Sequence, residues 1–219
     1  MVIISISQMK KIALFGATGQ TGQKFLKIAL EKGYSVKALA RDKSKLNNQS
    51  PLLTVFEGNV LNAQDVNKVV EDCDIVVSLF GHVKGSPELL QTNGTKNIIN
   101  SMLEFNVDKI ISLSGGGLPY PEKDKPKFVD KLIRTIMKIA VPKVLNDAIA
   151  HADVLKASGK KWVIVRAPRL TNEAKTGRYR IGWVGVNAST KINRYDLADF
   201  ILSQVEDEDF NFQMPFVSL

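Results

Sequence analysis

The stretch Lys11-Ile-Ala-Leu-Phe-Gly-Ala-Thr-Gly-Gln-Thr-Gly22 decides the fold of this chain. Its short apolar run, Ile12 to Phe15, predicts a buried strand. Three glycines follow at three-residue spacing, and they are Gly16, Gly19 and Gly22. Beyond them an apolar stripe with helical spacing predicts a helix, formed by Phe25, Leu26, Ala29 and Leu30. A strand, a tight glycine turn and a helix in this order are typical of a dinucleotide-binding site.

A dinucleotide site needs glycine at these positions for two reasons. The chain must turn sharply, often with a positive φ, and a pyrophosphate must approach the backbone closely. Free N–H groups at the start of the helix then face a doubly charged ligand, and Thr18 or Thr21 can cap the helix. The alternative is a glycine turn that only lets the helix pack on the strand. We assign to the cofactor site Gly16, Thr18, Gly19, Gln20, Thr21 and Gly22.

The size and composition of the chain fit one α/β domain over residues 1–219. Its 219 residues, of which 44% are apolar and 24% charged, are enough to bury a sizeable core. The net charge of +8 suits an anionic ligand, although charge alone also fits nucleic acid or a membrane surface. Residues 1–8 precede a natural start at Met9-Lys10-Lys11, and they are either an extension without function or an added edge strand.

Several classes of protein are not expected. The single cysteine, Cys73, excludes an internal disulfide and fits a reducing cytoplasm. The two histidines and this cysteine lie far apart in the sequence, so we expect no metal site. No run approaches the ~20 apolar residues of a membrane span. The first nine residues lack a basic start and a cleavage-like end, so we read no signal peptide and expect a cytoplasmic protein.

Strands and helices alternate along the rest of the chain. The pattern predicts strands at 35–40, 52–56, 74–80, 109–113 and 161–165, and helices at 62–71, capped by Asn62, and at 87–105. Gly94 is expected to lie where the second helix packs closely against the sheet. This alternation predicts a doubly wound, Rossmann-type parallel sheet with helices on both faces. From about residue 168 onward the pattern is mixed, with strands at 178–184 and 213–217 and a helix at 195–205, and this part is expected to shape the substrate pocket.

Residues 125–155 fall outside the simple alternation. The pattern is largely helical and is expected to break at Pro142. In the part near 127–140, an apolar set is interleaved with Lys131, Arg134 and Lys138. One interpretation is a helix that binds a membrane surface or a partner. The interpretation that we favour is a helix that covers the sheet beside the active site.

Gly16-Ala-Thr-Gly-Gln-Thr-Gly22 resembles the signature of the atypical short-chain dehydrogenase/reductases, and the resemblance extends over nearly the whole chain. The later stretches that carry it are Ala38-Leu-Ala-Arg-Asp42, Asn93-Gly-Thr-Lys-Asn97, Ile110-Ile-Ser-Leu-Ser114 and Trp162-Val-Ile-Val-Arg-Ala-Pro168. Residues 158–168 and Met214-Pro-Phe-Val-Ser218 resemble most the NAD(P)H-binding subgroup that is similar to biliverdin/flavin reductase. The resemblance implies a Rossmann fold and a pyridine-nucleotide cofactor.

Arg41 favours NADP(H) over NAD(H). After the second strand, NAD sites usually place an acid on the ribose diol. Here Arg41 comes first, followed by Asp42 and Lys43, and a guanidinium can hold a 2′-phosphate through two hydrogen bonds. The family resemblance also implies NADP where Arg41 stands. The alternative is a surface Arg41–Asp42 ion pair that contributes almost nothing.

The resemblance implies further cofactor contacts. Asn59 and Val60 are expected near the adenine, although the family often has aspartate where Asn59 stands. The end of the fourth strand is expected to border the ribose with Leu79, Phe80 and Gly81. Ser114 stands where the family has its active-site serine or threonine, and Pro168 and Arg169 are expected near the nicotinamide.

The main short-chain reductases use a tyrosine with a lysine four residues later, and this chain departs from that pattern. Its tyrosines are Tyr34, Tyr120, Tyr179 and Tyr195, and none is followed by lysine at that spacing. Reduction of a flavin or quinone does not require a proton-donating side chain, because charge delocalises over the acceptor ring and solvent can supply the proton. Ser114 is the candidate catalytic residue, and its alternative is a hydroxyl bonded to backbone at a strand end.

The remaining side chains with possible chemistry are two histidines and the cysteine. His151 is a possible proton donor on a helix, although a lone helical histidine is more often structural. His82 follows the fourth strand and could reach the cofactor, but an exposed loop is the interpretation that we favour. Cys73 is expected to be a packed thiol without a role.

Two functions remain open at this point. The first is an NADPH-dependent oxidoreductase that transfers hydride to a flavin-, quinone- or tetrapyrrole-like small-molecule acceptor. The second is a non-catalytic NADP(H)-binding sensor, similar to the nitrogen-metabolite-repression regulators. Nucleic-acid binding rests on charge alone and is not expected. We expect a monomer or a homodimer.

Overall fold

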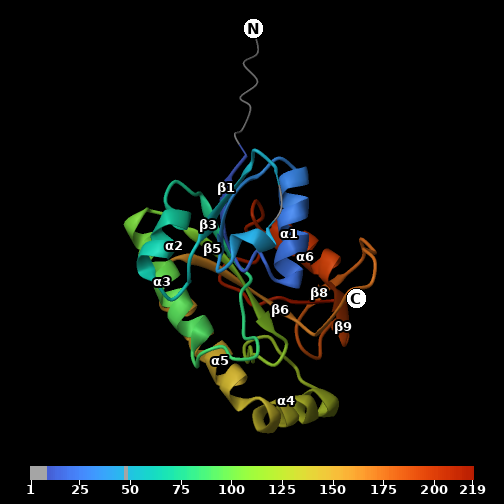
Figure 1. The fold of residues 1–219 in the computed structure, drawn as a ribbon. Helices are drawn as coiled ribbons and strands as arrows, with labels where there is room; N and C mark the ends of the chain where they lie inside the picture. The colour runs from blue at the N-terminus through green and yellow to red at the C-terminus, as the bar shows by residue number, and fades with distance from the viewer. Residues whose placement is uncertain (1–8, 47–48) are drawn as a thin grey trace.

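The computed structural model describes residues 9–46 and 49–219, and a sheet of eight strands forms the centre of this part (Figure 1). The strands of this sheet are β1 (Lys11–Phe15), β2 (Ser35–Ala40), β3 (Leu53–Glu57), β4 (Ile75–Ser78), β5 (Lys109–Gly115), β6 (Lys161–Ala167), β8 (Arg180–Gly182) and β10 (Phe216–Ser218). Their order is β3-β2-β1-β4-β5-β6-β10-β8. All neighbours pair in parallel except β8, which runs antiparallel to β10. The predicted doubly wound parallel sheet is confirmed.

Helices cover both faces of the sheet, as predicted. One face packs against α1 (Gln20–Glu31) and α6 (Arg194–Ser203), and the other packs against α2 (Ala63–Val70), α3 (Leu90–Glu104) and α5 (Pro142–Lys156). Side chains alternate between the two faces along each strand. In β1, Ile12 and Leu14 therefore join the core beneath α1, while Ala13 and Phe15 join the core on the opposite face. Burial on both faces explains why this strand is a continuous apolar run.

Local polar signals fix the starts of some helices but not of others. The side chain of Asn62 caps α2 as predicted, because it accepts hydrogen bonds from the Gln64 and Asp65 N–H groups. The helix expected at 87–105 begins later, at Leu90, since Leu89 has the left-handed φ of 54°. The close approach expected at Gly94 is confirmed on the Phe80 ring, which would lie 2.7 Å from an added Cβ.

The last third of the chain differs from the sequence prediction in its short elements. A separate two-stranded parallel pair, β7 (Arg169–Thr171) and β9 (Lys191–Asn193), was not predicted. The strands expected at 178–184 and 213–217 are the three-residue β8 and β10. Strands of three residues are too short to show a period-two pattern. Residues 1–8, interpreted above as an extension without function or as an added edge strand, lie outside the described residues, so neither interpretation is tested.

Helix α4 (Phe128–Ala140) corrects the interpretation that we favoured for the basic amphipathic segment. The break at Pro142 is confirmed, because α5 begins there. However, α4 buries none of its residues and lies beside α5 at the lower end of the molecule in Figure 1. It does not cover the sheet. Within residues 9–46 and 49–219, no helix has the length and apolar character needed to cross a membrane.

Candidate functional site

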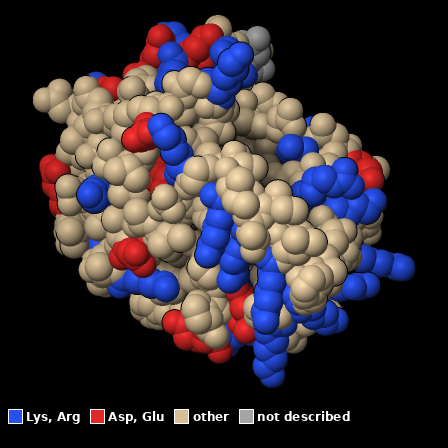
Figure 2. Space-filling view, turned by 90° about the horizontal axis from the view of Figure 1, so that it is seen from below, with Lys and Arg blue, Asp and Glu red and all other residues tan. Residues whose placement is uncertain are grey.

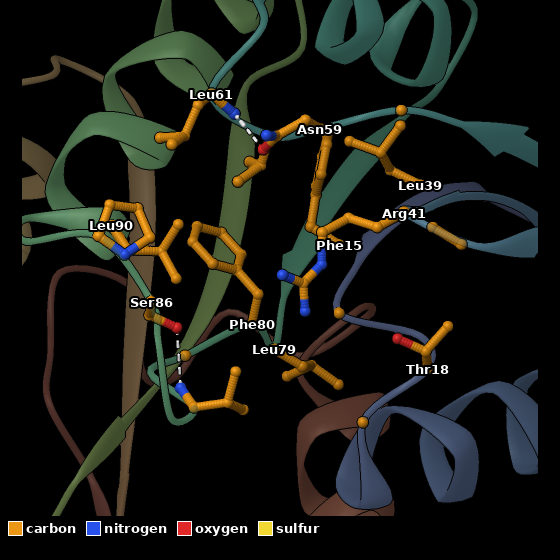
Figure 3. Close-up of a pocket in the computed structure, with 18 residues that line it drawn as sticks. Phe15, Thr18, Leu39, Arg41, Asn59, Leu61, Leu79, Phe80, Ser86 and Leu90 are labelled. Atoms are coloured by element: carbon orange, nitrogen blue, oxygen red, sulfur yellow. Dashed lines mark hydrogen bonds between the residues drawn. The ribbon is translucent and has the colours of Figure 1, made fainter. Parts of the chain in front are cut away.

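The strand order reverses direction at β1, and a cavity opens beyond the carboxyl ends of β1, β2 and β4. This switch point is where open α/β sheets bind ligands. Figure 3 shows the cavity with the side chains that surround it. Its lining contains nine of the predicted cofactor residues, which are Gly16, Thr18, Gly19, Arg41, Asn59, Val60, Leu79, Phe80 and Gly81. The lining residues that the sequence did not indicate are Phe15, Leu39, Ala40, Gly58, Leu61, Val83, Ser86, Pro87 and Leu90.

The glycine turn is required by its geometry. Gly16 has φ +88°, and a Cβ at this position would lie 2.5 Å from the Phe80 backbone nitrogen. A Cβ on Gly22 would lie 2.0 Å from the Gly16 carbonyl oxygen, so this glycine lets α1 pack against the turn. Gly19 is different, because a Cβ there would come no closer than 3.3 Å to protein atoms. Gly19 lines the cavity, and its missing side chain leaves room for a ligand to approach the backbone.

The start of α1 corrects one prediction. Gly19 is the capping residue, and no side chain caps this helix in the described part of the chain, so the capping role suggested for Thr18 or Thr21 is wrong. Thr18 lines the first cavity, but Gln20, Thr21 and Gly22 line none of the three cavities described here. Without a side-chain cap, the first N–H groups of the helix remain available to an anion.

Arg41 carries the only charge among the lining residues of this cavity that the structure describes. In Figure 3 its side chain reaches from the end of β2 across the cavity toward Leu79 and Phe80. The alternative of a surface pair with Asp42 is wrong, because the Asp42 carboxylate accepts hydrogen bonds from the Ser44 N–H and hydroxyl groups and lies 3.8 Å from Lys45 Nζ. These Ser44 hydrogen bonds lower the pKa of Asp42. The Arg41 guanidinium is therefore free of a carboxylate partner within residues 9–46 and 49–219.

Asp65, at the start of α2, holds the turn that carries Asn59. Its carboxylate accepts a hydrogen bond from the Asn59 N–H at 3.0 Å, and this bond lowers the pKa of Asp65. The Asn59 side chain in turn accepts a hydrogen bond from the Leu61 N–H at 3.1 Å (Figure 3). Asp65 is a site residue that was not predicted, although its position three residues after Asn62 is that of an acid in the first turn of a helix.

A second cavity continues from the first, since both are lined by Leu79, Phe80 and Gly81. It also contains the predicted residues Ser114 and Pro168. Ser114 lies at the end of β5 and is 6% exposed, and its hydroxyl has no hydrogen-bond partner in the described structure. The alternative of a hydroxyl bonded to backbone is therefore not what the structure shows. A buried, unpaired hydroxyl that faces a cavity is suited to a ligand.

A third cavity follows the second and shares Gly115, Ala167 and Pro168 with it. Its volume of about 420 Å³ is within the range of small-molecule sites. Arg169 lines this cavity and neither of the others. The remaining lining comes from the triple glycine after β5, from α4 and from the C-terminal third, namely Gly116, Gly117, Asp130, Ile133, Arg134, Met137, Val184, Ser189, Thr190 and Phe216.

A buried ion pair supports the wall of the third cavity. Arg166 is fully buried, and its two terminal nitrogens donate to the two carboxylate oxygens of Asp124, each at 2.8 Å. Asp124 also accepts hydrogen bonds from the Tyr120 and Val184 N–H groups. Arg166 additionally donates to the Leu118 and Met214 carbonyl oxygens. The pair thus joins β6, the loop after β5 and the C-terminal segments that line the cavity.

His82 and His151 have structural partners. His82 does not lie in an exposed loop, because its Nε2 is 2.6 Å from the fully buried carboxylate of Asp147. Asp147 also accepts hydrogen bonds from the Gln91 and Thr92 N–H groups and so caps α3. Burial raises the pKa of Asp147, but these hydrogen bonds outweigh it and the pKa is lowered. Burial lowers the pKa of His151 to about 4, and its Nε2 is 2.9 Å from the Ser112 hydroxyl. His151 lines none of the three cavities.

Cys73 and the tyrosines lie outside the cavities. Burial raises the pKa of Cys73 to about 12, and its thiol donates to the Val69 carbonyl oxygen, so the expected packed thiol is confirmed. Among the described residues that line the three cavities there is no tyrosine. In the same part of the chain, no group of three or more His, Cys, Asp or Glu side chains is arranged to hold a metal ion.

The comparison with known families agrees with this site. The sequence model of the family described as NAD(P)H-binding matches residues 16–208, from the first glycine of the turn almost to the end of the chain. The chain belongs to the NAD(P)H-binding family. Cinnamoyl-CoA reductase 1 of Petunia hybrida is 29% identical over 133 residues. That match covers 55% of this chain but only 40% of the reductase, so the chain spans less than half the length of this relative.

Solved structures share the fold of this NAD(P)H-binding protein. A short-chain dehydrogenase/reductase from Veillonella parvula DSM 2008 in complex with NADP superimposes with a TM-score of 0.77 at 17% identity, and covers 97% of this chain and 95% of its own. ChuY, an anaerobillin reductase from Escherichia coli O157:H7, superimposes with a TM-score of 0.75 at 18% identity, covering 95% and 96%. At these identities the likeness concerns the fold.

Proposed function

We propose that this member of the NAD(P)H-binding family is an NADPH-dependent reductase that transfers hydride to a flavin-, quinone- or tetrapyrrole-like acceptor. One observation carries the proposal. Three cavities follow one another along the carboxyl edge of the sheet, and the unpaired Ser114 hydroxyl lies in the middle one. The first cavity suits a dinucleotide, and the third provides space for a second, smaller molecule. The middle cavity is where the reacting rings of the two would meet.

The residues of the first cavity fit NADP(H). The turn from Gly16 to Gly22 offers bare backbone and an uncapped helix start to a diphosphate. Arg41, which no carboxylate engages within the described residues, would hold the 2′-phosphate. No acidic side chain lines the described part of this cavity to bind a ribose diol in the manner of NAD sites. Asn59 and Val60 would border the adenine, and Leu79, Phe80 and Gly81 the ribose.

The acceptor end favours a delocalised ring. When bound, the reduced cofactor supplies hydride, and the chain has to orient the acceptor and exclude water. No tyrosine lines the described cavities to protonate a carbonyl oxygen. Ser114 would instead donate a hydrogen bond to the acceptor, while Pro168 and Arg169 would lie beside the nicotinamide. The likeness to ChuY suggests the tetrapyrrole acceptor. The quinone and flavin acceptors are suggested because their reduction needs no proton-donating side chain.

The test is single-turnover hydride transfer. The chain is mixed with NADPH deuterated at C4, and a flavin, a quinone or an open-chain tetrapyrrole is added. We expect acceptor-dependent oxidation of NADPH with one of these acceptors, and a primary isotope effect that slows it relative to unlabelled NADPH. Ser114→Ala should lower the single-turnover rate constant about ten- to a hundredfold, which is the effect of one lost charge-assisted hydrogen bond, and should change the Kd for NADPH much less. Ser112→Ala is the matched control, because Ser112 is bonded to His151 and lines no cavity described here.

The same experiment separates the sensor hypothesis. The absence of tyrosine from the described cavity linings also fits a non-catalytic NADP(H)-binding protein. Such a protein would bind NADPH and NADP with measurable affinity but would show no oxidation of NADPH with any of the three acceptor classes. Failure to bind either nucleotide in calorimetry would reject both the reductase and the sensor.

A further inference from the structure

Helix α4 turns two charged side chains toward the protein and most of its large apolar side chains toward solvent. The half-buried residues Asp130, Arg134 and Met137 stand on successive turns and form the inner side. Arg134 lies 3.8 Å from the Asp124 carboxylate, and Met137 lies beside Gly117. The usual surface helix has the opposite arrangement, with its apolar stripe against the core.

The outer side of α4 is a continuous apolar row. Phe128 is 80% exposed and Ile139 78%, and the row is completed by Val129, Leu132 and Ile136, each at least half exposed. These five residues fall within an arc of about 100° around the helix. The exposed row continues past the helix at Val141 and Val144. Isolated exposed apolar residues need no explanation, but a contiguous patch marks an interaction surface.

Cationic side chains flank this row. The segment 125–144 contains five lysines and one arginine, against one acid, Asp130, which faces inward. Lys131 and Lys138 are exposed on one flank of the row, and no ion pair engages them within the described part of the chain. Figure 2, which views the molecule from below and so from the end that carries α4, shows lysine and arginine side chains beside a broad uncharged surface.

We propose that α4 docks this protein on an anionic lipid surface. The apolar row would enter the boundary between headgroups and acyl chains, while Lys131 and Lys138 would meet the lipid phosphates. A second copy of the chain is a poorer occupant. A two-fold interface would bring the same patch together on both subunits, so these unpaired lysines would face each other without an outward acid.

The position of α4 connects this surface to the third cavity. Ile133, Arg134 and Met137 line that cavity from the inner side of the same helix. A protein docked through α4 would therefore hold the third cavity behind the helix that rests on the lipid. Given the proposed function, an acceptor that leaves the bilayer would have only a short distance to travel to this cavity. Docking itself does not depend on the proposed function and is measured without turnover.

The experiment is flotation of the full chain with vesicles. We expect binding to vesicles rich in phosphatidylglycerol to be at least tenfold tighter than binding to pure phosphatidylcholine, and to weaken as salt is raised. The double change Lys131→Gln with Lys138→Gln should weaken binding about fivefold per lysine. The double change Phe128→Glu with Ile136→Glu should abolish binding. All four side chains are outside the cavity linings, so NADPH affinity in lipid-free solution should stay unchanged.

Matched controls use exposed residues elsewhere. Leu103→Glu replaces a 55% exposed apolar side chain on α3. Lys32→Gln with Lys156→Gln removes two exposed lysines, one directly after α1 and one at the end of α5. These variants should bind vesicles like the parent chain. The proposal is rejected by equal binding to both vesicle types, by no binding, or by equal losses in the controls. It is also rejected by a lipid-free dimer that Phe128→Glu with Ile136→Glu dissociates, because a second copy would then cover α4.

Discussion

Arg41→Ala should weaken the binding of NADPH and leave the binding of NADH unchanged. In the free protein the guanidinium has no carboxylate partner among the described residues, because Ser44 and Lys45 engage the neighbouring Asp42. The substitution therefore removes no native ion pair, and the free energy of unfolding should change by less than about 0.5 kcal/mol. In the complex, Arg41 would contribute one or two hydrogen bonds to the 2′-phosphate.

The size of the effect follows from the exposure of this side chain. A charge-assisted hydrogen bond contributes about 1.5–3 kcal/mol, and the lower value suits an exposed arginine. One or two such bonds correspond to a Kd for NADPH that rises about ten- to a hundredfold. The Kd for NADH, which lacks the phosphate, should not change. Isothermal titration calorimetry with NADPH and NADH measures both values directly.

The control for this prediction is a neighbouring cation. Lys43 is exposed and lies two residues further along, but it does not line the cavity. Lys43→Ala should change either affinity less than twofold at physiological salt, because a screened surface charge contributes little. If Arg41→Ala weakens NADPH and NADH equally, or leaves NADPH binding intact, the reasoning about the 2′-phosphate is wrong.

Two further predictions concern buried charges. Burial lowers the pKa of His151 to about 4 in the native state, whereas the unfolded chain has a pKa of about 6.5. This difference contributes about 3 kcal/mol to the free energy of unfolding above about pH 6.5, and the contribution is lost as the pH falls from about 6.5 to about 4. His151→Gln removes the titrating group and keeps a polar partner for Ser112. In urea denaturation, its free energy of unfolding should fall less steeply with falling pH than that of the parent chain. An equal slope with pH in both proteins would contradict the prediction. Asp124→Asn should lower the free energy of unfolding by about 3–5 kcal/mol, since Arg166 would keep a buried charge without a carboxylate. The control is Glu206→Gln, which breaks the exposed Lys10–Glu206 pair. The prediction is wrong if Asp124→Asn costs less than about 1 kcal/mol in denaturant titration, or no more than this control.

The sequence predicted the parts of the fold whose causes are local. The strand before Gly16, the turn and α1 follow one another directly, so their pattern is visible within residues 11–31. The Asn62 cap is equally local, because its partners are two and three residues away. The error at Leu89 has the opposite cause. The start of α3 is set by Asp147, whose carboxylate comes from α5, 56 positions away from Gln91.

The same distinction explains the error over α4. Alternating apolar and basic residues predict an amphipathic helix, and α4 is one. The pattern does not say which side faces the protein. That choice depends on contacts of Arg134 and Met137 with Asp124 and Gly117, which no periodicity reveals. The helix was therefore predictable, but its orientation was not.

The two ends of the candidate site differ in how the chain builds them. The cofactor end rests on backbone geometry within a few residues, so a family model can match it in one continuous stretch. The acceptor end rests on Asp124, which joins Arg166 in β6 to the Val184 N–H across gaps of 42 and 60 residues. Substitutions in those loops can reshape the third cavity without touching the glycine turn. Under the proposed function, proteins that share this cofactor site can therefore differ in their acceptor, and the shape of the third cavity would decide which acceptor this chain takes.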